Sequence, residues 1–206
     1  MPNSERYRQL GKRLTVLHRR FLPGQLSATG AYSDSQFDRA RAYRLLVHAE
    51  FESCVEELVM QMANEAYAAW VGPRRASRTA LCLLAFCDKN LGKVPDHLPT
   101  LGPPEIDSRL KAAKDQFCNY VAGQNNGIRT DNLLRMLLPV GIREADIDSG
   151  WLATAHSFGI DRGGTAHGSH HVVNPPDPQT ELDTVSQLKA GMRDIDSKIL
   201  TMRKRL

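Results

Sequence analysis

Residues 33–71, SDSQFDRARAYRLLVHAEFESCVEELVMQMANEAYAAWV, decide the fold class of this chain. Ser33 and Gln36 have the spacing of a capping box, in which the two side chains satisfy backbone N–H groups at the start of a helix. Apolar residues then recur every three or four positions to the end of the segment, and Gly72 and Pro73 follow as stop signals. The segment therefore predicts one long amphipathic α-helix.

Helical periodicity continues on both sides of this segment. Further helices are predicted at about 5–22, 76–89, 105–122, 130–138, 146–158 and from 180 to the C-terminus. The helix at 76–89 is apolar on most sides, which predicts a central position. A polar turn rich in Gly and His is predicted at 159–171. Because no segment has the two-residue alternation of a strand, the predicted fold is all-α, a bundle of long helices with shorter helices packed across it.

The chain is predicted to form a single domain. Its 206 residues are enough for one compact core. The Pro- and Gly-rich stretches 92–104 and 168–178 are interpreted as loops, since the helices that flank them carry apolar faces that need each other. The segment 180–206 is predicted as a C-terminal helix that closes this domain.

The C-terminal segment has a near-heptad apolar seam. Its members are Leu182, Val185, Leu188, Met192, Ile195, Ile199 and Met202. Such a seam packs along another helix. The spacing leaves open whether that helix belongs to the same chain or to a second copy.

The composition predicts a cytoplasmic protein that makes no membrane contact. No run approaches 18 apolar residues, and the basic N-terminus lacks the apolar core of a secretory signal. The four cysteines form no C-x-x-C pair and are expected to be reduced, mostly buried thiols. A net charge of +4 permits a polyanionic partner such as RNA without requiring one.

The candidate chemistry lies in Arg162-Gly-Gly-Thr-Ala-His167. Phosphate-binding loops, dinucleotide fingerprints, H-E-x-x-H and serine hydrolase elbows are all absent. RNA can be cut without a metal when a base deprotonates the 2′-hydroxyl and an acid protonates the leaving 5′-oxygen, and histidine suits both tasks near neutral pH. A guanidinium can hold the charge that gathers on the phosphorane oxygens. DNA lacks the 2′-hydroxyl and would be spared.

Spacing alone does not identify this pair. The chain has three Arg/His pairs with four to six intervening residues, namely Arg13/His18, Arg41/His48 and Arg162/His167. The first two fall inside predicted amphipathic helices, whereas the third falls in a Gly-rich turn where side chains can converge on a ligand. If the third segment were helical, its Arg and His would sit about 140° apart around the axis and about 7.5 Å along it. A second copy of the motif across a two-fold axis would then complete a site more easily.

The histidines of this region also suggest a metal site. His167, His170 and His171 cluster in the predicted turn, and His156 precedes them. Cysteines and paired carboxylates are missing from the neighbourhood, so the prediction includes no metal and no cofactor. A metal-dependent hydrolase remains the alternative, and it would lose activity in EDTA.

The sequence around this motif resembles that of HEPN domains, and most of all the RiboL-PSP-HEPN branch. The segment 151–168, which contains Arg162 and His167, is similar to the HEPN signature of an Arg, four to six residues and a His. The segment 41–52 resembles the long second helix of that branch. The segments 125–129, 132–134 and 138–142 resemble its middle part, and the three stretches occur in the right order.

The resemblance implies an α-helical domain, a homodimer and a composite active site at the interface between two such motifs. It implies RNA cleavage, commonly in toxin–antitoxin or anti-phage systems, with a possible antitoxin or other protein partner. Carried over by position, Arg162 would stabilise the transition state and His167 would act as acid or base. Many active members have a polar residue after the Arg, where this chain has Gly163. That departure favours the alternative of a non-catalytic helical module that binds RNA, nucleotide or a protein.

Three further residues are candidate accessory groups. His48 and Glu50 lie on the long helix close to Glu52, and the two carboxylates point to different faces. One of them is expected near Arg162 or His167, unless both are solvated. His170 is a candidate contact for phosphate, the alternative being a loop histidine without a ligand.

Overall fold

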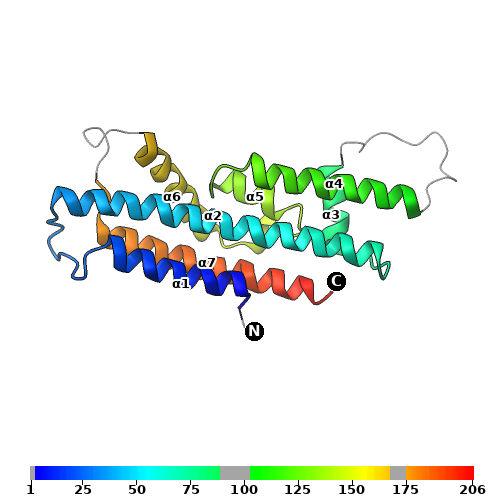
Figure 1. The fold of residues 1–206 in the computed structure, drawn as a ribbon, viewed down its shortest axis with the longest axis horizontal. Helices are drawn as coiled ribbons and strands as arrows, with labels where there is room; N and C mark the ends of the chain where they lie inside the picture. Colours follow the sequence, from blue (N-terminus) through cyan, green and yellow to red (C-terminus); the bar gives the residue numbers. More distant parts are fainter. Residues whose placement is uncertain (1–2, 89–102, 168–174) are drawn as a thin grey trace. The chain divides into compact units, whose positions relative to one another are not determined.

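The protein is all-helical, as predicted. The computed structural model describes residues 3–88, 103–167 and 175–206, without the side chains of 103–104 and 166–167. No strand occurs in those ranges (Figure 1). The elements are α1 (Glu5–Phe21), α2 (Asp34–Val71), α3 (Arg78–Cys87), α4 (Pro103–Gly123), α5 (Thr130–Leu137), the short 3-10 helix η2 (Glu144–Asp146), α6 (Ser149–His167) and α7 (Pro178–Arg203).

The long helix α2 begins at the capping box. The backbone N–H of Ser33 donates to Gln36 Oε1 over 2.8 Å, and the backbone N–H of Gln36 donates to Ser33 Oγ over 3.3 Å. Both halves of the box are therefore formed. The helix ends at Val71, as predicted from the Gly72 and Pro73 that follow it.

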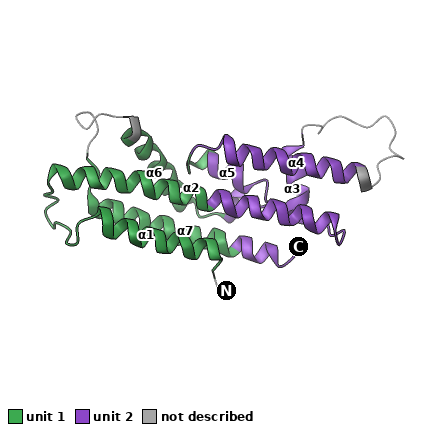
Figure 2. Ribbon diagram, viewed as in Figure 1, with its two compact units in different colours: residues 1–54, 127–131, 147–197 green, residues 55–126, 132–146, 198–206 purple. Residues whose placement is uncertain are grey.

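The described chain divides into two compact units (Figure 2). Unit 1 comprises residues 1–54, 127–131 and 147–197, and unit 2 comprises 55–126, 132–146 and 198–206. Helices α2 and α7 each contribute residues to both. Most of the predicted loop 92–104 and of the predicted loop 168–178 lies outside the described residues. The single domain stays a prediction.

Unit 1 is built from α1, α6, most of α7 and the first part of α2. Tyr7 at the start of α1 donates its hydroxyl to the carbonyl of Lys189 on α7 over 3.1 Å. Trp151 on α6 donates its indole N–H to the carbonyl of Leu188 over 3.0 Å. A Cβ at Gly191 would lie 2.1 Å from Trp151 Cδ1, so α7 needs glycine where the indole crosses it.

The apolar seam of α7 packs within the chain itself. Val185, Leu188, Met192, Ile195 and Ile199 are buried. Burial of these side chains is the dominant stabilising term in a helical fold. The intramolecular alternative for this seam is therefore confirmed.

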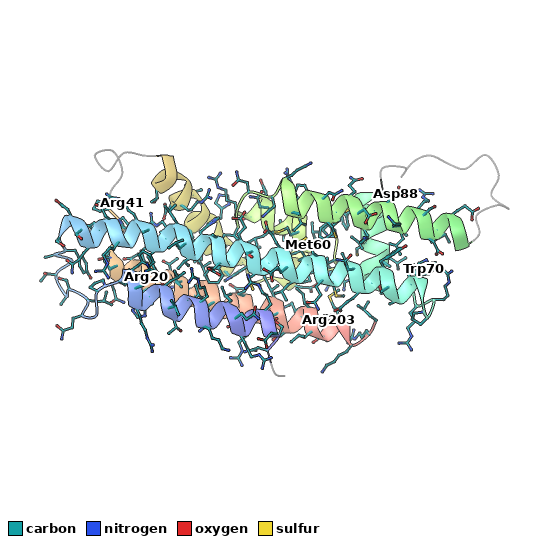
Figure 3. The ribbon with its side chains drawn as sticks, in the orientation of Figure 1. Arg20, Arg41, Met60, Trp70, Asp88 and Arg203 are labelled. Atoms are coloured by element: carbon teal, nitrogen blue, oxygen red, sulfur yellow. The ribbon has the colours of Figure 1, made fainter. Side chains whose placement is uncertain are left out.

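Unit 2 contains the rest of α2 with α3, α4 and most of α5. Helix α4 is tied to α2 through Asp107, which accepts from Trp70 Nε1 and from Arg74 Nη1 over 2.6 Å each. Arg203, labelled in Figure 3, pairs with Glu65 on α2.

Two predictions about individual helices were wrong. Helix α3 is not central, because Leu81 is 61% exposed and Phe86 is 60% exposed. Only one face of this short helix is buried. The C-terminal helix begins at Pro178, two residues before the predicted start at 180, because Asp177 Oδ2 accepts from the Thr180 backbone N–H over 2.8 Å and caps the first turn.

The four cysteines are free thiols, and Cys54 is the one that is fully buried. The other three, Cys82, Cys87 and Cys118, are partly exposed, so the expectation of mostly buried thiols was too strong. In the part of the chain that the structure describes, no helix is both long enough and apolar enough to cross a lipid bilayer.

Candidate functional site

Arg162 and His167 both belong to helix α6, which corrects the predicted turn over residues 159–167; the rest of that prediction lies outside the described residues. The helix continues past Phe158 and has His167 as its last residue. The two residues are therefore about 140° apart around one helix axis and about 7.5 Å apart along it. The His167 backbone follows Gly163 by four residues, which is about one turn along the same stripe. The side chain of His167 lies outside the described atoms.

Arg162 is half-buried and has no carboxylate partner among the described residues. Other arginines with low exposure do have one: Arg44 pairs with Glu181, Arg109 with Asp88, and Arg203 with Glu65. Removing a guanidinium from water without a counter-charge costs free energy. The position of Arg162 is therefore typical of a group kept for an anionic ligand.

Helix α2 presents three polar side chains in one stripe. Arg44, His48 and Glu52 are spaced by four residues, which places them one turn apart. Arg44 and His48 are buried, and Glu52 is partly buried. Within unit 1, Arg44 contacts α7, His48 contacts α6, and Glu52 contacts the turn at Gly127. This polar stripe of α2 is the structural support of the candidate site.

His48 lies at the centre of the stripe, against α6. Its side chain is 1% exposed and its ring stacks on Phe158 with centroids 6.1 Å apart. Burial lowers the pKa of His48 to about 4, and the nearby positive charges of Arg162 and Arg129 contribute to this lowering. Among the described residues Nδ1 has no hydrogen-bond partner, and it lies 3.7 Å from the Glu52 carboxylate. The candidate accessory residue His48 is thus a neutral, buried neighbour of Arg162.

His48 should make the protein less stable in acid. The pKa of His48 is about 4 in the folded protein, against 6.5 for an ordinary histidine, so between these values the unfolded chain binds more protons. Stability is then full above about pH 6.5 and falls as the pH drops to 4, by on the order of 3 kcal/mol. Urea unfolding at about pH 7 and about pH 4.5 measures the loss.

A His48→Gln variant, which cannot titrate there, provides the control. It should lose less stability than the wild type between the two pH values. If both proteins show the same loss, His48 is not the group responsible and the proposed link between its burial and acid sensitivity is wrong.

Of the two carboxylates considered on α2, Glu52 belongs to the polar stripe and Glu50 does not. Glu50 accepts from Arg13 Nε of α1 over 2.7 Å. Glu52 accepts from the backbone N–H of Gly127. Gly127 has a φ of +104°, a conformation that favours glycine, so this contact fixes the turn that leads to Arg129.

Arg129 is a residue that the sequence did not single out. It is exposed, and its side chain extends over two glycines of α6. A Cβ at Gly159 would lie 2.9 Å from Arg129 Cγ, and a Cβ at Gly163 would lie 3.1 Å from Arg129 Nη2. The guanidinium thus lies against the residue that follows Arg162. Among the described residues it has no carboxylate partner.

Arg44 holds the C-terminal half of α6 to α7. Its Nε donates to Glu181 Oε2 over 3.1 Å and its Nη2 donates to Oε1, and the Glu181 side chain is 3% exposed. Its Nη1 donates to Thr165 Oγ1 over 3.2 Å. An open pocket of about 380 Å³ lies beside this pair, lined also by Asp161 of α6. One guanidinium and two carboxylates line that pocket, which disfavours a phosphate there.

The remaining candidate histidines are placed only in part. His156 accepts a weak hydrogen bond at Nδ1 from the Thr130 backbone N–H over 3.4 Å. His170 and His171 lie outside the described residues, as does the His167 side chain. In the described ranges there is no group of three or more His, Cys, Asp or Glu side chains that could hold a metal ion.

Comparison of the chain with protein-family models, with curated proteins and with solved structures finds no significant match. The site therefore has to be interpreted from its own geometry and from the resemblance of its sequence motif.

Proposed function

We propose that this protein is a metal-independent endoribonuclease of the HEPN type. His167 transfers the proton at the attacking 2′-hydroxyl or at the leaving 5′-oxygen. Arg162 binds the non-bridging oxygens of the phosphate and stabilises the charge that develops on them. The motif resemblance to toxin–antitoxin and anti-phage proteins suggests a role in such a system.

The observation that carries this proposal is the unpaired state of Arg162 among the described residues. A half-buried guanidinium without a counter-charge is costly in an apo protein and becomes favourable when an anion binds. A phosphodiester is an anion with the forked geometry that a guanidinium prefers. The same helix carries His167 about one turn beyond Gly163.

The helical geometry of α6 also supports a homodimer with the site at the interface. Arg162 and His167 of one chain do not share a stripe, since they sit about 140° apart. Two copies of α6 across a two-fold axis would bring an Arg of one chain toward a His of the other. Since the α7 seam is buried within the chain, the dimer would use another surface.

The proposal predicts cleavage of RNA and no cleavage of DNA. Purified protein is incubated with two single-stranded oligonucleotides of the same base sequence, one RNA and one DNA. The RNA should be cut and the DNA should remain intact, because only RNA supplies the 2′-hydroxyl nucleophile. Cutting of both at similar rates would reject the mechanism.

The alternative is a non-catalytic helical module that binds RNA, nucleotide or a protein partner. Gly163, which replaces a polar residue of the HEPN motif, is the feature that favours it. Growth on expression separates the two functions. The nuclease proposal predicts arrest by the wild type and normal growth with His167→Ala, whereas arrest that survives this substitution favours the binding module.

A further inference from the structure

We infer that Arg129 is a second phosphate-binding residue, which together with Arg162 forms a two-guanidinium site for one RNA phosphodiester. This inference rests on the proposed function and names a residue that the motif does not contain. It also gives a reason for the glycine at position 163.

Arg129 contacts helix α6. Gly159 and Gly163 are one turn apart on this helix, and the Arg129 side chain lies over both. A Cβ at position 163 would be 3.1 Å from the guanidinium nitrogen, so a larger residue there would require the Arg129 side chain to shift by a few tenths of an ångström. The missing polar side chain after Arg162 therefore leaves the space that Arg129 occupies.

Positive charge gathers around His48. Arg129 and Arg162 both lie near His48, whose buried Nδ1 lacks a hydrogen-bond partner in the described part of the chain. His48 is neutral near pH 7, and the Glu52 carboxylate that lies 3.7 Å from its Nδ1 accepts from the backbone N–H of Gly127. Within the same ranges, no carboxylate pairs with either guanidinium. Two guanidinium groups near one neutral side chain repel each other, and an anion bound between them would relieve this repulsion.

His167 is the last residue of the stripe of α6 that Arg129 contacts. Gly159, Gly163 and His167 follow one another at intervals of four residues on α6. Arg129 therefore extends along the stripe on which the last residue is His167. A phosphate held by Arg129 and Arg162 would lie near the C-terminal end of α6, where the histidine of a second copy would reach it in the homodimer proposed above. The opposite side of α6 carries Asp161 and borders the pocket. The two carboxylates there outnumber the one guanidinium, so a phosphate would be repelled.

The test uses an RNA oligonucleotide with 2′-O-methyl groups, which cannot be cleaved, and measures its binding by fluorescence anisotropy at several salt concentrations. Arg129→Ala should weaken binding about 10-fold or more. It should also lower the slope of log affinity against log salt by about 0.7, the value for one phosphate contact on a single strand. The control is Arg135→Ala, which removes the same charge from an exposed position on α5 and should change neither value.

A matched glycine pair tests the contact itself. Gly163→Ala should push the guanidinium away by a few tenths of an ångström and weaken both binding and cleavage. Gly164→Ala should not, because no described atom outside its own turn of helix lies within 4 Å of the added Cβ. Both substitutions place alanine in the same helix, so their effects on helix propensity are similar.

The outcomes separate this inference from the proposed function. Equal binding and cleavage by Arg129→Ala and Arg135→Ala overturn the inference, even when His167→Ala abolishes cleavage. If the wild type cuts no RNA while Arg129→Ala still lowers affinity and salt slope, Arg129 is a phosphate contact of a binding protein. That result supports the two-guanidinium site and rejects the nuclease.

Discussion

His167→Ala should reduce the rate of RNA cleavage by about 10²- to 10⁴-fold, the usual contribution of a general acid or base. The expected effect is on kcat, because proton transfer occurs in the transition state and contributes little to RNA binding. Single-turnover cleavage of a labelled oligonucleotide measures the rate, and anisotropy with the uncleavable analogue measures binding.

The matched control is His18→Ala. His18 belongs to the Arg13/His18 pair on α1, where Arg13 forms an ion pair with Glu50. This pair has the same spacing as Arg162 and His167. The control variant should cleave at the wild-type rate. If both histidine variants are fully active, the motif assignment is wrong and the helical binding module is the better description.

The same kinetics can test the composite dimer site. Arg162→Ala and His167→Ala should each be inactive alone. Mixed after subunit exchange, they should regain part of the activity, because one protomer supplies the histidine and its partner supplies the arginine. Lack of rescue in a demonstrated heterodimer would place the site within one chain.

Arg44→Met should lower the free energy of unfolding by about 3–5 kcal/mol. The substitution leaves the Glu181 carboxylate buried at 3% exposure without its bidentate partner. It also removes the bond from Arg44 to Thr165, which fixes the helical turn after Arg162. Urea unfolding gives the midpoint and the slope from which this free energy is obtained.

Two controls give this prediction a sharp outcome. Arg44→Met combined with Glu181→Leu should recover much of the lost stability, because no charge is then left unpaired. Arg41→Met, which breaks the exposed pair with Asp38, should have a far smaller effect. A small loss for Arg44→Met would mean that the carboxylate is reached by water.

The sequence predicted the fold class well because local signals dominate in this chain. The capping box at Ser33 and Gln36 and the stop at Gly72 set the bounds of α2. The end of α6 was missed because Gly159, Gly163 and Gly164 have low helix propensity and predict a turn. The helix nevertheless continues through all three glycines, and a Cβ at Gly159 or Gly163 would crowd the Arg129 side chain.

The candidate site was predicted only where its residues are close in sequence. Arg162 and His167 are local neighbours, whereas Arg44 and Glu181 are 137 positions apart and meet only in the fold. Arg129 ends the segment 125–129 that resembles the HEPN branch, but the sequence assigned it no role in a site. The stripe of Arg44, His48 and Glu52 could have been found, because its four-residue spacing is visible once the helix is assigned.

The most direct test of the central claim is end-group analysis of RNA incubated with the purified protein in excess EDTA. We expect cleavage to continue and to leave 2′,3′-cyclic phosphate ends with free 5′-hydroxyls, since the 2′-oxygen is the nucleophile and no metal takes part. Loss of cleavage in EDTA, or products with 5′-phosphate ends, would contradict the account.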